Sequence, residues 1–233
     1  MQNKFFYIAN WKSYLSYQQA VYWCAHHAAE LKEIADQGNV VICSDFLAIS
    51  DIQKILPSTM ALGAQNCSMH TLGAFTGEVS AQSLQEVGVR YCIIGHSERR
   101  KMFDETSEII GQKMERLLEQ GIVPIICVSD EYAIELKPIA NLFKSKTYVL
   151  IAYEPIAAIG TGNVASNQHI EKVFQSIKKI CRQKGAELDI RLLYGGSVNG
   201  QNSAVLKKIE LLDGFLIGKA SMDFIEFKQI ILA

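Results

Sequence analysis

Three residues that could carry out acid-base chemistry each follow a short apolar run of this 233-residue chain: Lys12, His96 and Glu154. An ammonium, an imidazole and a carboxylate that meet in one site suit proton abstraction next to a carbonyl group. The carboxylate would remove the proton, and the other two groups would polarise the oxygen on which enediolate charge develops. Taken singly, each residue has a simpler explanation: a surface lysine, a satisfied histidine and an exposed loop acid.

Glycine-rich segments follow two further apolar runs, at Tyr194-Gly195-Gly196-Ser197 and at Gly218-Lys219. Glycine lets backbone N–H groups approach an anion closely, and turns after the last strands of an α/β barrel commonly hold phosphate. An ordinary tight turn is the alternative for each segment alone. A third small-residue segment, AAIGTG (157–162), follows Glu154 and suggests a lid that protects a reactive enediol phosphate from water.

The composition excludes several classes of protein. Net charge is −1 and there is no long basic run, so we expect no nucleic-acid partner and no membrane surface. The amino-terminal segment MQNKFFYIANWK is too short and too polar for a signal peptide, and no apolar stretch approaches the ~20 residues of a membrane span. Six scattered cysteines indicate reduced core thiols in a cytoplasmic protein, and no histidine or cysteine cluster predicts a metal site.

Eight apolar runs recur along the chain and predict strands. They are FFYIA (5–9), VVIC (40–43), MALGA (60–64), YCIIG (91–95), IVPIIC (122–127), YVLIAY (148–153), DIRLLY (189–194) and GFLIG (214–218). The runs are continuous rather than alternating, as in parallel strands that are buried on both faces. The pattern predicts one (β/α)8 barrel domain over residues 1–233, with eight parallel strands surrounded by helices. A doubly wound open sheet is the alternative, which the lack of a GxGxxG after the first run weakens.

Helical periodicity fills most of the intervals between these runs. Apolar residues share one helix face in Tyr17–Asp36, in Ser107–Gln120, which Gly121 should end, and in Asn167–Lys184. In such a barrel, function lies at the carboxyl ends of the strands. We therefore expect the lysine, the imidazole, the carboxylate and the glycine-rich turns to meet at one mouth.

The chain also resembles the triosephosphate isomerase family over its full length. The resemblance is carried by ANWK (9–12), GAQN (63–66), GAFTGE (73–78), IIGHSERR (93–100), AYEP (152–155), AIGTG (158–162), YGGSV (194–198) and DGFLIGKAS (213–221). It implies a TIM barrel and the cofactor-independent interconversion of dihydroxyacetone phosphate and D-glyceraldehyde 3-phosphate through an enediolate. This reaction belongs to glycolysis and gluconeogenesis.

The resemblance also implies a role for each matching residue. Glu154 would be the base that moves the proton between two carbons, and His96 the neutral electrophile. Lys12 would neutralise phosphate and enediolate charge, Asn10 would donate to a substrate oxygen, and Glu98 would bond Lys12 or organise its surroundings. The backbone N–H groups that bind phosphate would come from Gly160, Ser197, Gly218 and Lys219.

A lid and a dimer contact are implied in the same way. The lid and its hinges would run from Pro155 to Ala165, with Tyr194 and Ser197 as the latch. Ile159 and Leu216 would press over Glu154 when the lid closes, and the loss of water would raise the pKa of the base. The loop Gln65–Glu78, with Phe75 and Thr76, would reach a neighbouring subunit, where Thr76 would brace Asn10 and Lys12 in a homodimer.

Besides a segment from Cys127 to Ala152 that is shorter than usual, the sequence departs from the family pattern at three places. Ala157 stands where the family usually has a tryptophan in the first lid hinge, and Ser129-Asp130 stands where it usually has Gly-Glu. Lys219 replaces a second glycine of the last turn, so a Cβ lies where close approach matters. The first two changes suggest altered lid opening, and none of the three touches Glu154, His96 or Lys12.

Two other functions compete with the isomerase. Another phosphate-binding barrel enzyme is the first, but a Schiff-base aldolase needs a lysine within a strand, whereas Lys12 and Lys219 both follow strands. A non-catalytic scaffold is the second, and it predicts eroded active residues. The residues alone predict a metal-free enolisation of a small phosphorylated carbonyl compound, and the resemblance supplies the triose.

Overall fold

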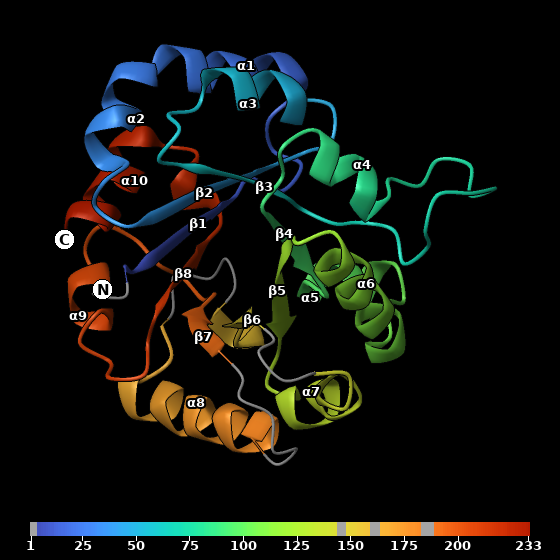
Figure 1. Ribbon diagram of the computed structural model, residues 1–233. Coiled ribbons are helices and arrows are strands. Elements are labelled where there is room, and N and C mark those ends of the chain that lie inside the picture. The colour runs from blue at the N-terminus through green and yellow to red at the C-terminus, as the bar shows by residue number, and fades with distance from the viewer. Residues whose placement is uncertain (1–3, 144–147, 159–163, 183–188) are drawn as a thin grey trace.

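The computed structural model describes residues 4–143, 148–158, 164–182 and 189–233, and it shows a closed barrel of parallel strands (Figure 1). The strands are β1 (Phe6–Asn10), β2 (Asn39–Ser44), β3 (Ala61–Ala64), β4 (Tyr91–Ile94), β5 (Val123–Val128), β6 (Tyr148–Tyr153), β7 (Asp189–Tyr194) and β8 (Gly214–Ile217). Each strand pairs with the next, and β1 closes the ring on β8. The predicted barrel is confirmed, and the open sheet is wrong.

Helices surround the barrel and cover the outer face of its strands (Figure 1). They are α1 (Tyr17–His26), α2 (Ala28–Ile34), α3 (Ile49–Ile55), α4 (Ala81–Glu86), α5 (Ser97–Met102), α6 (Ser107–Glu119), α7 (Tyr132–Ala140), α8 (Asn167–Arg182), α9 (Ser203–Leu206) and α10 (Phe224–Leu232). Two 3-10 turns, η1 (Ile156–Ala158) and η2 (Lys219–Ser221), follow β6 and β8. In the described part of the chain, no helix is long and apolar enough to cross a bilayer.

The alternation of side chains along each strand aims two of the predicted site residues into the barrel mouth. Successive side chains of a strand point to opposite faces, so every second one fills the interior. In β6, Leu150 and Ala152 belong to the inner cluster, and in β1 Ile8 does. Continuing the same alternation by one step places Glu154 and Asn10 on the inner side, at the carboxyl ends of their strands.

Two of the three predicted helices are confirmed, and the third is divided. The helix expected over Tyr17–Asp36 breaks at His27, which lies between α1 and α2 with φ −99° and ψ 14°. The imidazole of His27 stacks on the ring of Phe224 in α10, with centroids 4.3 Å apart and an 8° angle between planes. The two residues are nearly two hundred positions apart in the sequence, so local periodicity could not reveal this contact.

The same histidine makes the stability of the fold depend on pH. Burial and the neighbouring His26 lower the pKa of His27, and together they outweigh Glu30 and Asp223, which raise it. The unfolded chain therefore takes up the proton more readily, with an ordinary pKa of about 6.5. The contribution of His27 to stability is complete above that value and is lost as pH falls below it.

We therefore expect wild-type protein to lose urea resistance between about pH 7.5 and pH 5.5, and the His27→Gln variant to lose less over the same interval. Glutamine keeps a polar side chain of similar reach but does not titrate. Urea midpoints measured across this interval test the expectation. Parallel pH profiles for the two proteins would contradict it.

Candidate active site

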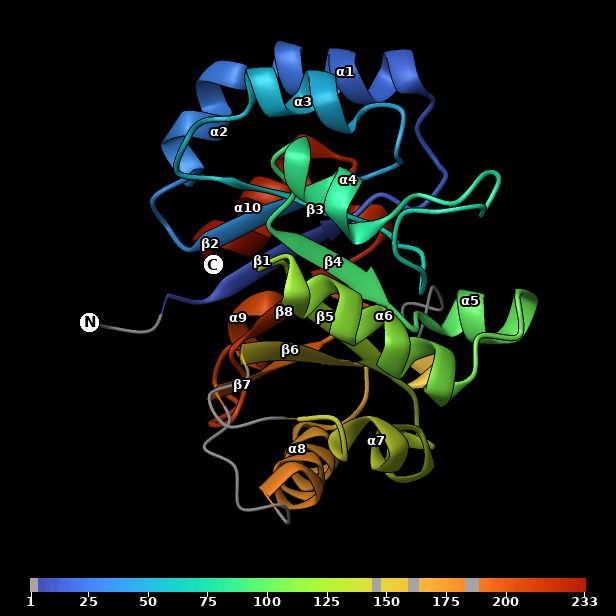
Figure 2. The same ribbon diagram turned by 45° about the vertical axis from the view of Figure 1, so that its right-hand side comes forward.

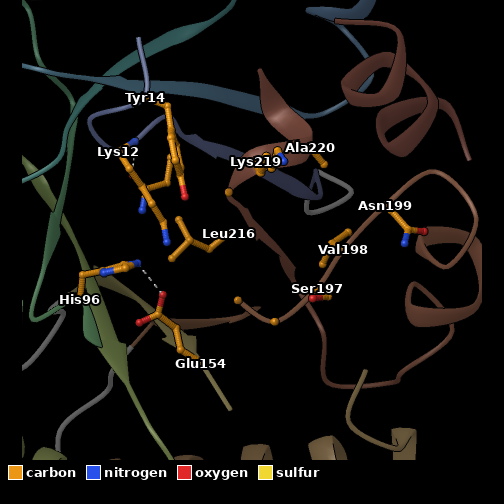
Figure 3. A pocket seen from close by; sticks show the side chains of 14 residues that line it. Lys12, Tyr14, His96, Glu154, Ser197, Val198, Asn199, Leu216, Lys219 and Ala220 are labelled. Carbon is orange, nitrogen blue, oxygen red and sulfur yellow. Dashed lines mark hydrogen bonds and ion pairs between the residues drawn. The ribbon is translucent and has the colours of Figure 1, made fainter. Parts of the chain in front are cut away.

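A cavity of about 420 Å³ lies at the carboxyl ends of the strands and brings the predicted residues together (Figure 3). Asn10 and Lys12 reach it from β1, His96 from β4 and Glu154 from β6. The turns after β7 and β8 form the opposite wall, with Ser197, Gly218 and Lys219 among the lining residues. Segments that are far apart in sequence therefore meet at one mouth, as the strand-end rule predicts.

Glu154 stands at the floor of this cavity with both carboxylate oxygens bound. Its exposed fraction is only 2%, and Oε1 lies 3.0 Å from Nε2 of His96. Oε2 accepts a hydrogen bond of 3.1 Å from the backbone N–H of Ser97, the first residue of α5. Gly195 leaves room for this side chain, because a Cβ there would lie 2.9 Å from Cγ of Glu154.

His96 caps the amino end of α5, and this position determines which ring nitrogen carries a proton. The backbone N–H of Glu98 donates to Nδ1 of His96 at 3.2 Å. Because Nδ1 accepts, the neutral ring carries its proton on Nε2 and donates it toward Glu154. The imidazole therefore faces the cavity through Nε2, with Glu154 as its hydrogen-bond partner (Figure 3).

Opposing influences act on the acidity of Glu154. Burial is the largest of them and raises the pKa of the carboxyl group. The field and hydrogen bond of His96, the N–H of Ser97 and the charge of Lys12 act in the other direction, and together they hold the pKa below its ordinary value. The raised pKa expected for a closed lid thus does not apply to this arrangement, in which both oxygens are hydrogen-bonded.

Lys12 is held in an unusual backbone conformation beside Asn10. Its φ is 49°, in the left-handed region that non-glycine residues rarely adopt. Its N–H donates to Oδ1 of Asn10 at 3.1 Å, and its carbonyl accepts from Nε2 of Gln65 at 2.8 Å. The ammonium lies 2.6 Å from Oε1 of Glu98, the pairing that the resemblance implied.

Two residues that help to shape the site carried no expected role. Gln65, in the quoted GAQN, also donates to the carbonyl of Cys43 at 3.0 Å, so one amide ties the ends of β1 and β2 together. Asn202 donates to the carbonyl of Ser197 at 2.9 Å and accepts from the N–H of Asn199 at 2.9 Å. The GAQN motif was a signal for the first, and the sequence held no comparable signal for the second.

The expected lid is described only at its two ends. Pro155 is buried at the end of β6, and Ala165 donates its N–H to the hydroxyl of Tyr194 at 3.2 Å. Leu216 is 3% exposed and lines the cavity between Lys12 and Glu154 (Figure 3). Ile159 and Gly160 lie outside the described residues.

The segment between β3 and α4 projects away from the barrel, as the turned view shows (Figure 2). Phe75 is 41% exposed, and its ring stacks on that of His70 with centroids 3.9 Å apart. Thr76 is also exposed and does not line the cavity that holds Asn10 and Lys12 in its own chain.

Fold and site together define a (β/α)8 barrel enzyme with an acid-base centre at the carboxyl ends of its strands. The sequence model described as triosephosphate isomerase matches residues 5–233. The chain is 39% identical to the triosephosphate isomerase of Alkaliphilus metalliredigens, over 86% of this chain and 90% of the relative. It is 36% identical to that of Thermus thermophilus over 95% of both chains, and 39% identical to that of Aquifex aeolicus over 85% and 87%.

The chain belongs to the triosephosphate isomerase family, and the resemblance drawn from its motifs is confirmed. It is accordingly an isomerase, and neither the aldolase nor the non-catalytic scaffold describes it. The individual roles of Glu154, His96 and Lys12 stay predictions, which the geometry above makes testable.

The contacts of Glu154 predict a specific pH profile. Because His96 helps to keep the carboxylate ionised, the acidic limb of the free wild-type enzyme should have its midpoint below about pH 4.3, the ordinary pKa of glutamate. In a His96→Ala variant, burial acts with less opposition, and the acidic limb should move to higher pH.

The measurement is kcat/KM against pH for both proteins, corrected for the second ionisation of the substrate phosphate. An acidic limb that lies at the same pH in both proteins would contradict this account of the Glu154 carboxyl.

Proposed function

We propose that this chain interconverts dihydroxyacetone phosphate and D-glyceraldehyde 3-phosphate, with Glu154 as the base and His96 as the electrophile. The observation that carries the assignment is the 3.0 Å contact between Oε1 of Glu154 and Nε2 of His96 at the floor of the cavity. In a substrate that enters between them, the two groups would contact two adjacent atoms. The carboxylate would face a carbon-bound hydrogen, and the ring N–H would face the neighbouring oxygen.

The reaction then proceeds by proton transfer alone. Glu154 takes a proton from the carbon next to the carbonyl, and the electron pair of that C–H bond forms the enediolate. His96 gives its Nε2 proton to the carbonyl oxygen and takes back the proton of the hydroxyl on the neighbouring carbon, so the ring ends as it began and the second oxygen can become the new carbonyl. The ammonium of Lys12 and the amide of Asn10 stabilise the negative charge that develops on these oxygens. The protonated carboxyl group returns the proton to the adjacent carbon, so no atom is gained or lost overall.

Substrate binding also explains how a carboxylate with a lowered pKa becomes a strong enough base. The substrate would take the place of Glu154 as the acceptor of the His96 proton. Glu154 would then lose a hydrogen bond that now lowers its pKa, whereas burial, which raises it, would remain. The carboxylate would therefore become more basic only when a substrate occupies the cavity.

The phosphate of the substrate would lie at the wall made by the turns after β7 and β8. Ser197, Gly218 and Lys219 line this wall and would supply backbone N–H groups. The side chain of Lys12 reaches the same cavity from the other side, where its charge attracts a dianion. The mouth thus matches a three-carbon compound with a phosphate at one end.

A coupled assay of the purified protein with each triose phosphate tests the function. In this assay we expect Glu154→Asp to lower kcat by roughly a hundredfold or more, because the carboxylate retracts by about 1 Å from the reacting carbon. The matched control is Glu210→Asp, an exposed residue ahead of β8 at the opposite end of the barrel, which should retain full activity. A loss below about threefold for Glu154→Asp would remove Glu154 from the role of base.

We further infer that the chain forms a homodimer through the segment Gln65–Glu78. A second cavity, of about 290 Å³, opens beside the active site, and its lining includes Phe46, Met102 and Phe103. These three side chains are 40%, 70% and 61% exposed, an apolar surface that a partner would cover. Asn10 and Lys12 also line this cavity, so the partner's Thr76 could brace them there.

Sedimentation of a micromolar sample tests the dimer, and we expect a species of twice the chain mass. A compact monomer with full activity would refute the inference.

The six cysteines are free and buried, which suits a reducing compartment, and on that ground we infer a cytoplasmic location.

A further inference from the structure

A second carboxylate, Asp130, binds the chain just before and just after the proposed base, Glu154. Its Oδ1 accepts a hydrogen bond of 2.6 Å from the hydroxyl of Tyr153, the residue before Glu154. Its Oδ2 accepts a hydrogen bond of 3.2 Å from the N–H of Ile156, two residues after Glu154. One side chain therefore holds the chain on both sides of Glu154 and Pro155.

His169, in α8, holds the same hydroxyl from another direction. Its Nε2 lies 2.9 Å from the oxygen of Tyr153. A carboxylate can only accept, so the single proton of the Tyr153 hydroxyl goes to Asp130. His169 must then be the donor, and the chain of hydrogen bonds runs from His169 to Tyr153 to Asp130. Tyr153 is fully buried, so these are the contacts that satisfy its hydroxyl.

The loop that carries Asp130 is itself fixed to neighbouring elements. The N–H and hydroxyl of Ser129 both donate to Glu135 in α7, at 2.7 and 3.0 Å. Arg100 donates to the carbonyl of Cys127 at 3.2 Å, just before this loop, and to the carbonyl of Gly95 at 2.8 Å. Because Arg100 belongs to α5, the support of Asp130 is tied to the helix that begins next to His96.

We propose that Asp130 and His169 are positioning residues, which act through Tyr153 and the N–H of Ile156 to fix Glu154 against His96. The inference rests on the proposed role of Glu154 as base. Neither residue lines the cavity, so neither touches the substrate. Their effect is on where the carboxylate stands, and a displacement of about 1 Å in a reacting group can cost about a hundredfold in rate.

Three substitutions separate the parts of this support. Tyr153→Phe removes only the hydroxyl and keeps the buried ring. Asp130→Asn has one acceptor oxygen instead of two, so it can accept from the Tyr153 hydroxyl or from the N–H of Ile156, but not from both. His169→Gln retains an amide donor for the hydroxyl, whereas His169→Phe removes the donor and keeps a ring.

We expect Tyr153→Phe and Asp130→Asn each to lower kcat by about tenfold or more, with KM changed less than about threefold. His169→Phe should lower kcat in the same way, and His169→Gln should restore most of it. The double variant Tyr153→Phe with His169→Phe should fall no further than Tyr153→Phe alone, since both act through one hydroxyl. The matched control is Tyr7→Phe, which removes another buried hydroxyl, bonded to the carbonyl of Ile231 at 3.1 Å, and should keep kcat.

The test measures kcat, KM and the thermal midpoint of each protein in the coupled assay. A wild-type protein without isomerase activity would overturn the proposed function and this inference with it. An active wild type whose folded Tyr153→Phe and Asp130→Asn variants keep kcat would overturn this inference alone. An equal loss of kcat in Tyr7→Phe, or no difference between His169→Phe and His169→Gln, would also overturn it.

Discussion

The chemistry of this site depends on a buried hydrogen bond between the carboxylate of Glu154 and the imidazole of His96. A carboxylate that is 2% exposed needs hydrogen-bonding partners to stay ionised, because burial disfavours the charged form. Here His96 and the N–H of Ser97 supply that compensation. In the proposed mechanism, the same contacts hold Glu154 in place and keep it weakly basic until the substrate replaces it as the acceptor of the His96 proton.

The closed barrel brings these two groups within hydrogen-bond distance, because β4 and β6 are separated by β5 alone. Alternation along β6 aims Glu154 inward, and the chain after β4 turns at Gly95, with φ 65°, so that His96 caps α5 beside it. A closed ring has no free edge, so the spacing of the two strand ends is fixed by the barrel itself. The site is therefore a property of strand register as much as of the residues that line it.

Much of this arrangement could be predicted from the sequence. Continuous apolar runs identify buried parallel strands, and the residues just past them identify the mouth, because both signals are local in sequence. The motifs around Glu154, His96 and Lys12 then identify the family. The strand ends and the predicted cavity residues among the described part of the chain agree with that interpretation.

Other features depend on contacts between distant segments, which no local pattern reveals. At the break between α1 and α2, His27 stacks on Phe224 in α10. The hydroxyl of Tyr153 meets Asp130 and His169 only because β5, β6 and α8 are neighbours in the fold. The lowered pKa of Glu154 likewise depends on the partners of both carboxylate oxygens, which only the folded structure shows.

The central claim is that Glu154 moves a proton between carbon atoms while His96 serves the adjacent oxygen. Incubation with dihydroxyacetone phosphate in D₂O, followed by NMR of the substrate and product, tests this claim most directly. A proton held on a carboxyl group can exchange with solvent, so deuterium should enter the exchanging carbon positions, and Glu154→Gln should abolish the incorporation. Isomerisation without any deuterium, or unchanged incorporation in Glu154→Gln, would contradict the account.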